Sequence, residues 1–331
     1  MTGSEAGPEM NPVEDAGGKP AGRSVRRVAV RWLFYLAIVV AFGWFVWTVD
    51  WASLEGLQVG WGWVVAATAV SLAFRYLGVL VWRVVLARLG ARDLPPFRAM
   101  SDIYAKAWLA RYIPGTVPWI AGKIYMAAEH GISKSRLAVS TLVEAAAQVV
   151  AVGTVSLTLL AVDPRIGEVS PTLRLVVAVG AALGLVTMTP PVFNRVLRLG
   201  FRVLRRQAPE RIGWAVVRDS LGLYAVGAVL SGVAYALLMR SLVPSTTAAD
   251  MLFLVGAFGF SGVVGMLTPL VPSGLGTRDA TQFALLLVVL PASTASLVVL
   301  ASRVWSALVD VLFWAIAVAL ERARRGGAGA A

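Results

Sequence analysis

Residues 137–162 read LAVSTLVEAAAQVVAVGTVSLTLLAV, an apolar run interrupted by a single charged side chain, Glu144. The run is longer than the roughly 20 residues that an α-helix needs to cross the hydrocarbon core of a bilayer. Similar runs recur along the chain, which has 331 residues, of which 58% are hydrophobic and only 15% charged. A soluble domain of this size carries about a quarter charged residues. The sequence therefore predicts an all-α integral membrane protein.

The composition excludes several classes of site and partner. The chain has no Cys, which rules out disulfides, thiol nucleophiles and Cys-ligated metals. His130 is its only His, which argues against His-rich metal sites and Ser-His catalysis. The net charge of +12 comes mainly from arginines that flank apolar runs, so we expect no nucleic-acid partner. No cofactor is expected either.

Six runs are predicted to be full transmembrane helices. They cover about Trp32–Val49, Gly62–Leu86, Leu137–Val162, Leu173–Met188, Leu221–Met239 and Leu297–Leu320. Arginines cluster before the first run and after the second, fourth and last, whereas the opposite connections are short and mixed in charge. Basic residues accumulate on the cytoplasmic side, so both termini are predicted to be cytoplasmic in a multi-pass protein of the cytoplasmic (inner) membrane.

The chain is predicted to divide into a membrane domain and two tails. Residues 1–22 are polar and rich in Gly and Pro, which predicts a disordered cytoplasmic tail. Residues 23–321 form a single transmembrane domain in this interpretation, and residues 322–331 form a short cytoplasmic tail.

Two apolar intervals, Pro95–Ser133 and Asp250–Ser296, are broken by Pro and Gly. Given the predicted spans, each interval has to enter and leave the membrane from the same side. The first does so from the cytoplasmic side and the second from the opposite side. Span, re-entrant hairpin and span would then occur twice in an inverted repeat, at about residues 60–162 and 217–320, a common transporter plan. The alternative is that both intervals are interfacial amphipathic helices that never enter the bilayer.

Ionisable residues inside the predicted spans are candidates for function. Arg75, Glu144 and Arg303 each lie within an apolar run, where a charge is costly and normally faces a partner or a cavity. Arg presents planar, permanently charged donors that suit a phosphate. The alternative is structural: Glu144 pairs with Arg303 or Arg75 and joins the two repeats.

The broken intervals also carry a family resemblance. Tyr112-Ile113-Pro114-Gly115, Gly122-Lys123, Gly131-Ile132-Ser133 and Glu144 resemble the first signature of the lysylphosphatidylglycerol synthase/flippase transmembrane-domain family. The run from Pro272 to Ala280, PSGLGTRDA, followed by Arg303, resembles its second signature. Lys123 stands where Arg is usual, Ser273 where Gly is usual and Asp279 where Glu is usual.

The resemblance implies a non-enzymatic protein that moves an anionic phospholipid or a polyprenyl-phosphate-linked lipid across the membrane for cell-envelope assembly. The chain ends about ten residues past the last predicted span, so we do not expect the soluble aminoacyl-transferase domain of bifunctional members. An envelope glycosyltransferase or lipid synthase is a possible protein partner. The candidate substrate-binding residues are Arg75, Pro114, Gly115, Lys123, Glu144, Gly274, Gly276, Arg278 and Arg303.

Two other functions stay open at this point. One is a non-transporting membrane scaffold for such a synthase or glycosyltransferase. The other is a membrane glycosyltransferase, against which the first predicted external loop counts, because it has Asp50 and Glu55 but no Asp-x-Asp.

Overall fold

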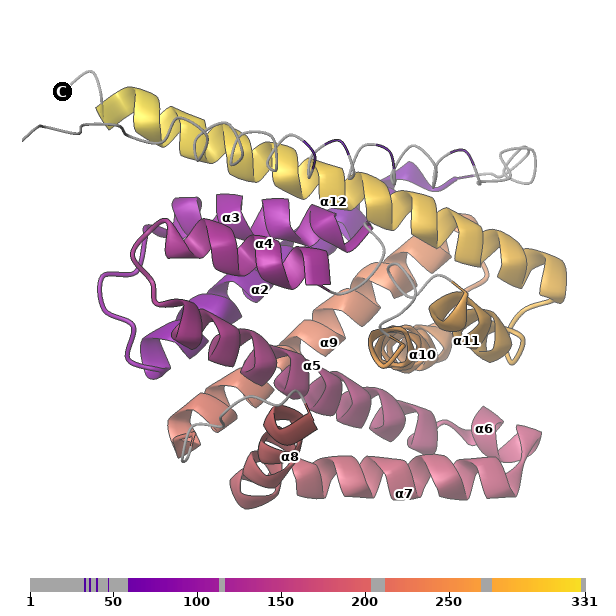
Figure 1. The fold of residues 1–331 in the computed structure, drawn as a ribbon. Coiled ribbons are helices and arrows are strands. Elements are labelled where there is room, and N and C mark those ends of the chain that lie inside the picture. Colours follow the sequence, from indigo (N-terminus) through magenta and orange to yellow (C-terminus); the bar gives the residue numbers. More distant parts are fainter. Residues whose placement is uncertain are drawn as a thin grey trace, which may run out of the picture.

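The computed structural model describes residues 59–112, 117–203, 212–268 and 276–328, together with Leu33, Leu36, Val40 and Trp47. Every regular element in these ranges is a helix (Figure 1). Five helices are long and apolar enough to cross a membrane: α2 (Trp61–Arg88), α5 (Lys134–Val162), α9 (Trp214–Leu242), α10 (Ala248–Met266) and α12 (Ala292–Ala328). The chain is therefore an all-α, multi-pass membrane protein. The first predicted span, Trp32–Val49, lies almost entirely outside the described residues.

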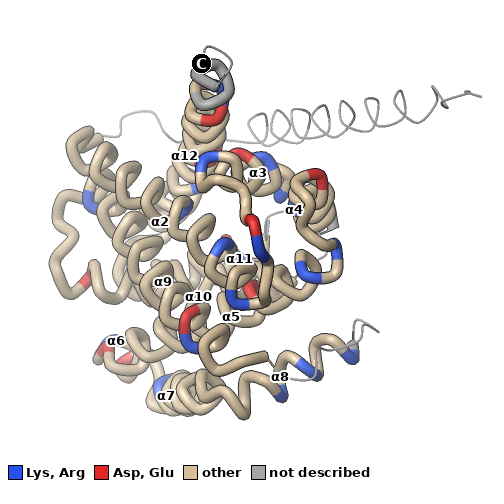
Figure 2. Tube along the Cα trace, turned by 90° about the vertical axis from the view of Figure 1, so that its left-hand side faces the viewer, with Lys and Arg blue, Asp and Glu red and all other residues tan. Residues whose placement is uncertain are grey.

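A sharp bend separates α7 (Pro171–Thr187) from α8 (Pro190–Val203). The two helices meet at 94°, and only the two together are long and apolar enough to cross a membrane. The bend falls at the Pro190-Pro191 pair, directly after the predicted end of the fourth span at Met188. α8 buries three apolar side chains, Phe193, Leu197 and Phe201, against the bundle. Its arginines at 195, 198 and 202 are exposed on the other side of the helix (Figure 2).

Each broken interval folds into two helices. The first contains α3 (Phe97–Leu109), which continues into the short 3-10 helix η2 (Ala110–Tyr112), and then α4 (Val117–Ala128). The second contains α10 and α11 (Thr277–Leu286). The connections at 113–116 and 269–275, with the predicted site residues Pro114, Gly115 and Gly274, lie outside the described residues. α10, at 19 residues, is long enough to span, so both the number of full spans and the re-entrant depth of the second hairpin stay predictions.

The helix contacts follow the same plan in both halves. α2 packs along α9, its counterpart in the other half. α3 packs against α12, and the corresponding pair, α10 and α5, packs in the same way. In each half the two hairpin helices also pack together, α3 on α4 and α10 on α11. α12 and α3 lie on one side of the bundle, and α7 and α8 on the other (Figures 1 and 2). This correspondence agrees with the predicted repeat; its inverted membrane orientation stays a prediction.

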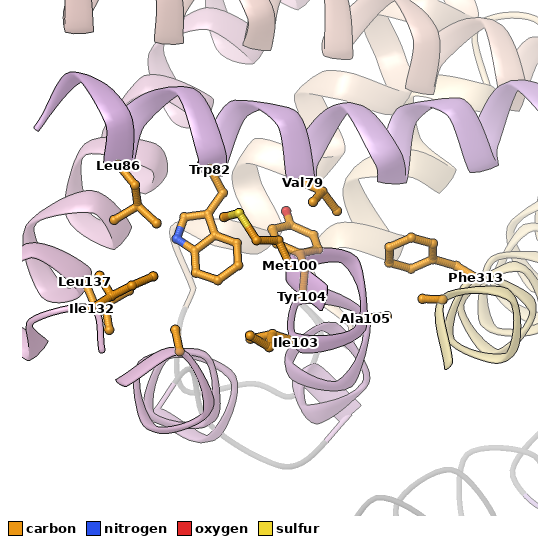
Figure 3. Close-up of a cluster of buried hydrophobic side chains, with 12 residues drawn as sticks. Val79, Trp82, Leu86, Met100, Ile103, Tyr104, Ala105, Ile132, Leu137 and Phe313 are labelled. Atoms are coloured by element: carbon orange, nitrogen blue, oxygen red, sulfur yellow. The ribbon is translucent and has the colours of Figure 1, made fainter. Parts of the chain in front are cut away.

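Two glycines allow the hairpins to pack closely on the helices before them. A Cβ on Gly78 of α2 would lie 2.6 Å from the Tyr104 hydroxyl of α3. A Cβ on Gly232 of α9 would lie 2.7 Å from the Cα of Val255 in α10. Around Gly78, Trp82 and Met100 pack with Tyr104 in a buried apolar cluster (Figure 3).

A short helix, α6 (Pro164–Val169), follows the C-terminal end of α5. Asp163 accepts hydrogen bonds from the Arg165 backbone N–H at 3.1 Å and from its guanidinium at 2.7 and 2.8 Å. Arg165 also donates to Asp250 in the first turn of α10 at 2.5 Å. These contacts tie the end of the third predicted span to the start of the second hairpin.

Candidate functional site

The centre of the bundle holds a cavity of about 230 Å³ to which both halves contribute. Its walls come from α2, α3, η2, α4, α5, α9, α10, α11 and α12. Three arginines line it: Arg75 from α2, Arg111 from η2 and Arg278 from α11. Gln148 of α5 and several serines add neutral polar groups, and aromatic rings make up much of the rest.

The carboxylate of Asp310 on α12 anchors two of these arginines. Arg75 donates to Oδ1 through Nε at 2.9 Å and Nη2 at 2.7 Å. Arg111 Nη2 lies 2.6 Å from Oδ2. The Trp108 indole donates to Oδ1 at 3.0 Å and the Tyr112 hydroxyl to Oδ2 at 2.8 Å. Asp310 is completely buried, and a buried carboxylate needs such a dense set of donors to offset its lost hydration.

Arg278 differs from Arg75 because no carboxylate of the described chain pairs with it. Its guanidinium lies over the ring of Phe258 in α10, 4.9 Å from the ring centroid. Phe258 in turn stacks on Tyr235 of α9 with centroids 4.5 Å apart. Tyr235 accepts a hydrogen bond at 2.8 Å from Gln282, which lies one turn after Arg278 on α11. Packing thus holds the guanidinium at the cavity without neutralising it.

Arg111 also has donor capacity left over. Its Nη2 contacts Asp310, but its Nε is buried and has no hydrogen-bond partner among the described residues. Leaving a buried donor unpaired costs free energy that a bound acceptor recovers. Arg111 thus lines the cavity with a guanidinium whose hydrogen-bonding capacity the described residues do not fully satisfy, and Arg278 lines it without a described carboxylate partner.

Glu144 does not reach this cavity. Its carboxylate binds Lys123 of α4, with both oxygens 2.9–3.0 Å from Nζ. Both side chains are almost inaccessible, at 1% for Lys123 and 3% for Glu144. The Lys123 ammonium also lies 4.4 Å from the centroid of Trp82 and 4.9 Å from that of Tyr104, two neighbouring rings of the buried cluster (Figure 3).

An equivalent pair joins the second hairpin to α12. Asp279 of α11 binds the Arg303 guanidinium through both carboxylate oxygens. Asp279 also accepts the backbone N–H of Gly276 at 2.7 Å and so caps the start of α11. Gly276 has a φ of +88°, a conformation that favours glycine, which explains why this residue type stands at the turn into α11. These two side chains are more accessible, at 17% for Asp279 and 23% for Arg303.

The structure thus separates the predicted site residues. Arg75 and Arg278 line the cavity, whereas Lys123, Glu144 and Arg303 are engaged in ion pairs outside its lining. The predicted pairing of Glu144 with Arg303 or Arg75 is wrong, because Lys123 lies closer in the fold and each of those arginines has its own aspartate. Arg111 and Trp108 were missed, although Arg111 directly precedes the Tyr112-Ile113-Pro114-Gly115 motif. Asp310 was not among the predicted site residues either.

Comparison with known families gives one match. The profile described as the lysylphosphatidylglycerol synthase TM region matches residues 29–313, most of the chain. No curated protein and no solved structure matches. The matched range includes every residue that lines the cavity.

Proposed function

The chain belongs to the family of the lysylphosphatidylglycerol synthase transmembrane region, and on that premise we propose that it translocates an anionic lipid across the cytoplasmic membrane. This family is one of membrane domains associated with lipid handling. In the proposed activity the head group passes through the central cavity and no covalent bond changes. An anionic phospholipid and a polyprenyl-phosphate-linked lipid both carry the phosphate that the cavity would bind.

The surplus of positive charge at the cavity supports this proposal most directly. Three arginines line the cavity, and the one carboxylate among the described residues that contacts any of them, Asp310, already accepts four donor groups. A cation that is not neutralised inside a membrane domain is costly and therefore marks a place where an anion binds. Arg suits a phosphate in particular, because its planar fork donates two parallel hydrogen bonds.

Reconstituted transport tests the proposal. In proteoliposomes that contain a fluorescent acidic lipid, the wild-type protein is expected to raise the rate at which the label moves between leaflets. Arg278→Gln removes the charge without breaking an ion pair and is expected to lower that rate by about tenfold or more, since a hydrogen bond to a charged group is worth about 1.5–3 kcal/mol.

The matched control is Arg195→Gln, which removes the same charge from the exposed side of α8. It should transport lipid at the wild-type rate. If the wild-type protein moves no lipid, the transport proposal fails and the scaffold function replaces it. If the Arg278→Gln variant is as fast as wild type, Arg278 does not contact the lipid on its path.

The proposed orientation has both termini and α8 on the cytoplasmic side. Single cysteines are simple to interpret because the natural chain has none. Arg195→Cys should react with an impermeant maleimide only when the cytoplasmic face is open to the reagent. Labelling from the outside of intact cells would reverse the assignment.

A further inference from the structure

The charges around the cavity indicate how many negative charges its ligand carries, and not only that the ligand is an anion. Arg75, Arg111 and Arg278 face one carboxylate, Asp310, which leaves a surplus of two positive charges. The neighbouring pairs Lys123–Glu144 and Asp279–Arg303 are each neutral and do not change that balance. The two connections outside the described residues, 113–116 and 269–275, contain no charged residue in the sequence.

The described lining of the cavity also lacks a carboxylate that would pair with an ammonium. None of the described lining residues is acidic, and the Asp310 oxygens are covered by Arg75, Arg111, Trp108 and Tyr112. Aromatic faces are the usual alternative for a ligand cation, within about 6 Å of the ring centroid.

Most of these aromatic faces already have a cation of the protein beside them. Phe74 lies 5.6 Å from Arg75, Trp108 lies 4.6 Å from Arg111, and Phe258 lies 4.9 Å from Arg278. The ring of Trp119 has the ammonium of Lys123 at 5.7 Å. Of the five aromatic residues that line the described cavity, Trp305 alone has no such cation, and its indole N–H donates to Thr68.

We propose that the cavity selects a lipid whose head group carries two negative charges and no ammonium, such as a phosphate monoester, and rejects an aminoacylated phospholipid. The inference rests on the proposed function and specifies its substrate class. A phosphate monoester presents three terminal oxygens, which suit the guanidinium groups of Arg111 and Arg278 in the cavity lining. A lysyl ester would place its ammonium groups among arginines, and the repulsion would have no compensating carboxylate.

Lipid-dependent thermal stability of the full chain in neutral detergent micelles tests this substrate class, because a ligand that binds only the folded protein raises its melting temperature. The probes are phosphatidic acid, phosphatidylglycerol and lysyl-phosphatidylglycerol at pH 8, where a phosphate monoester is close to doubly charged. Phosphatidic acid should half-saturate at about a tenfold lower lipid fraction than phosphatidylglycerol, the equivalent of about 1.4 kcal/mol. Lysyl-phosphatidylglycerol should give no stabilisation.

Two variants connect the result to the cavity. Arg278→Gln should raise the half-saturating fraction of phosphatidic acid to that of phosphatidylglycerol, because it removes one of the two surplus charges. Arg195→Gln should leave the wild-type preference unchanged. Glycerol 3-phosphate carries the same phosphate without acyl chains, and equal stabilisation by this soluble ester would show that the site does not require a lipid.

The possible failures are distinguishable. Equal half-saturation by phosphatidic acid and phosphatidylglycerol overturns the two-charge selectivity and leaves the proposed function standing. Stabilisation by lysyl-phosphatidylglycerol overturns the exclusion of ammonium groups. If neither acidic lipid stabilises the protein, the proposed function fails together with the substrate class.

Discussion

Each hairpin is tied to the long helix that follows it by one ion pair, and the two pairs carry their charges in opposite order. In the first half, the cation Lys123 lies on hairpin helix α4 and the anion Glu144 on α5. In the second half, the anion Asp279 lies on α11 and the cation Arg303 on α12. The first pair is buried among aromatic rings. The second is partly accessible, and its aspartate, Asp279, directly follows Arg278 in sequence.

This difference separates a structural from an adaptable connection. A fully buried pair has lost the hydration of both ions, so removing either partner leaves an uncompensated charge. A partly accessible pair keeps some hydration, and breaking it costs less. We therefore expect the first hairpin to be held rigidly on α5, and the second to move more easily relative to α12.

The largest expected effect is on the buried pair. Glu144→Gln keeps the shape of the side chain but strands the Lys123 charge, and the folded state should lose about 3–5 kcal/mol. The measurement is the melting temperature of the purified protein in detergent, with Glu168→Gln on the exposed surface of α6 as the matched control. A Glu144→Gln protein that is as stable as wild type but inactive would return Glu144 to the list of substrate contacts.

The second prediction compares the two close glycine contacts. Both Gly78→Ala and Gly232→Ala overpack a hairpin contact, which typically costs about 1–3 kcal/mol. Gly232→Ala should be the worse of the two, because the added methyl meets the backbone of Val255 rather than the end of the Tyr104 side chain. Gly222→Ala in α9, where the new Cβ meets nothing within 4 Å, is the control and should be neutral or slightly stabilising.

Thermal unfolding of the three variants in one detergent decides this order. If Gly78→Ala proved more damaging than Gly232→Ala, the first hairpin would be the more tightly packed at this contact as well as at its ion pair.

A smaller effect is expected at the accessible pair. Asp279→Asn should cost about 1 kcal/mol, because exposure screens the lost attraction to Arg303 and the amide still accepts the Gly276 N–H. The same change adds net positive charge next to the cavity. Stabilisation by phosphatidic acid should therefore be at least as strong as in wild type, which lipid titrations of the melting temperature would show. A collapse of both stability and lipid binding would contradict the view that this pair is adaptable.

The smallest effect concerns Asp163, which lies outside the spans. It binds Arg165, the residue that contacts Asp250 of the other half. The hydrogen bonds from Arg165 hold the pKa of the Asp163 carboxyl below its ordinary value of 3.8. A carboxyl with a depressed pKa stabilises the fold at pH values above the pKa of the unfolded chain, and that stabilisation is lost as the pH falls through the folded value. The melting temperatures of wild type and Asp163→Asn should differ by a constant amount from pH 5 to 7, and converge below about pH 4. A difference that stays constant as the pH falls below 4 would show that the charge of Asp163 is not what matters.

Hydropathy predicted the spans better than their ends. α2, α5 and α12 coincide with predicted runs, because a lipid-facing helix has to be apolar over its length. α9 begins at Trp214, whereas the predicted span began at Leu221. The prediction began too late because the first turns of α9 carry Arg218 and Asp219 and resemble a polar connection by composition. The bend between α7 and α8 lies at Pro190-Pro191, directly after the predicted end of the fourth span at Met188.

The site was harder to predict because its contacts join distant segments. Helical spacing places Glu144 on a face of its own helix but does not reveal which cation lies across from it. Asp310 collects its donors from α2, α3 and η2, a convergence that only the packed bundle shows. Arg111 was missed because it lies beside the Pro/Gly break of the first interval, whereas only charges inside the predicted full spans were selected from the residues alone.

The Asp310 contacts also limit how the molecule can move. This one side chain couples α12 to α2 and to the end of the first hairpin, so a displacement between these three elements would break several charged contacts at once. In the language of mechanics, the three elements form a single rigid link. α11 is joined to that link by the Asp279–Arg303 pair, the more accessible of the two hairpin pairs, and by neutral hydrogen bonds of Gln282. A displacement of α11 relative to that link would therefore break one ion pair rather than several, and it would carry Arg278 with it.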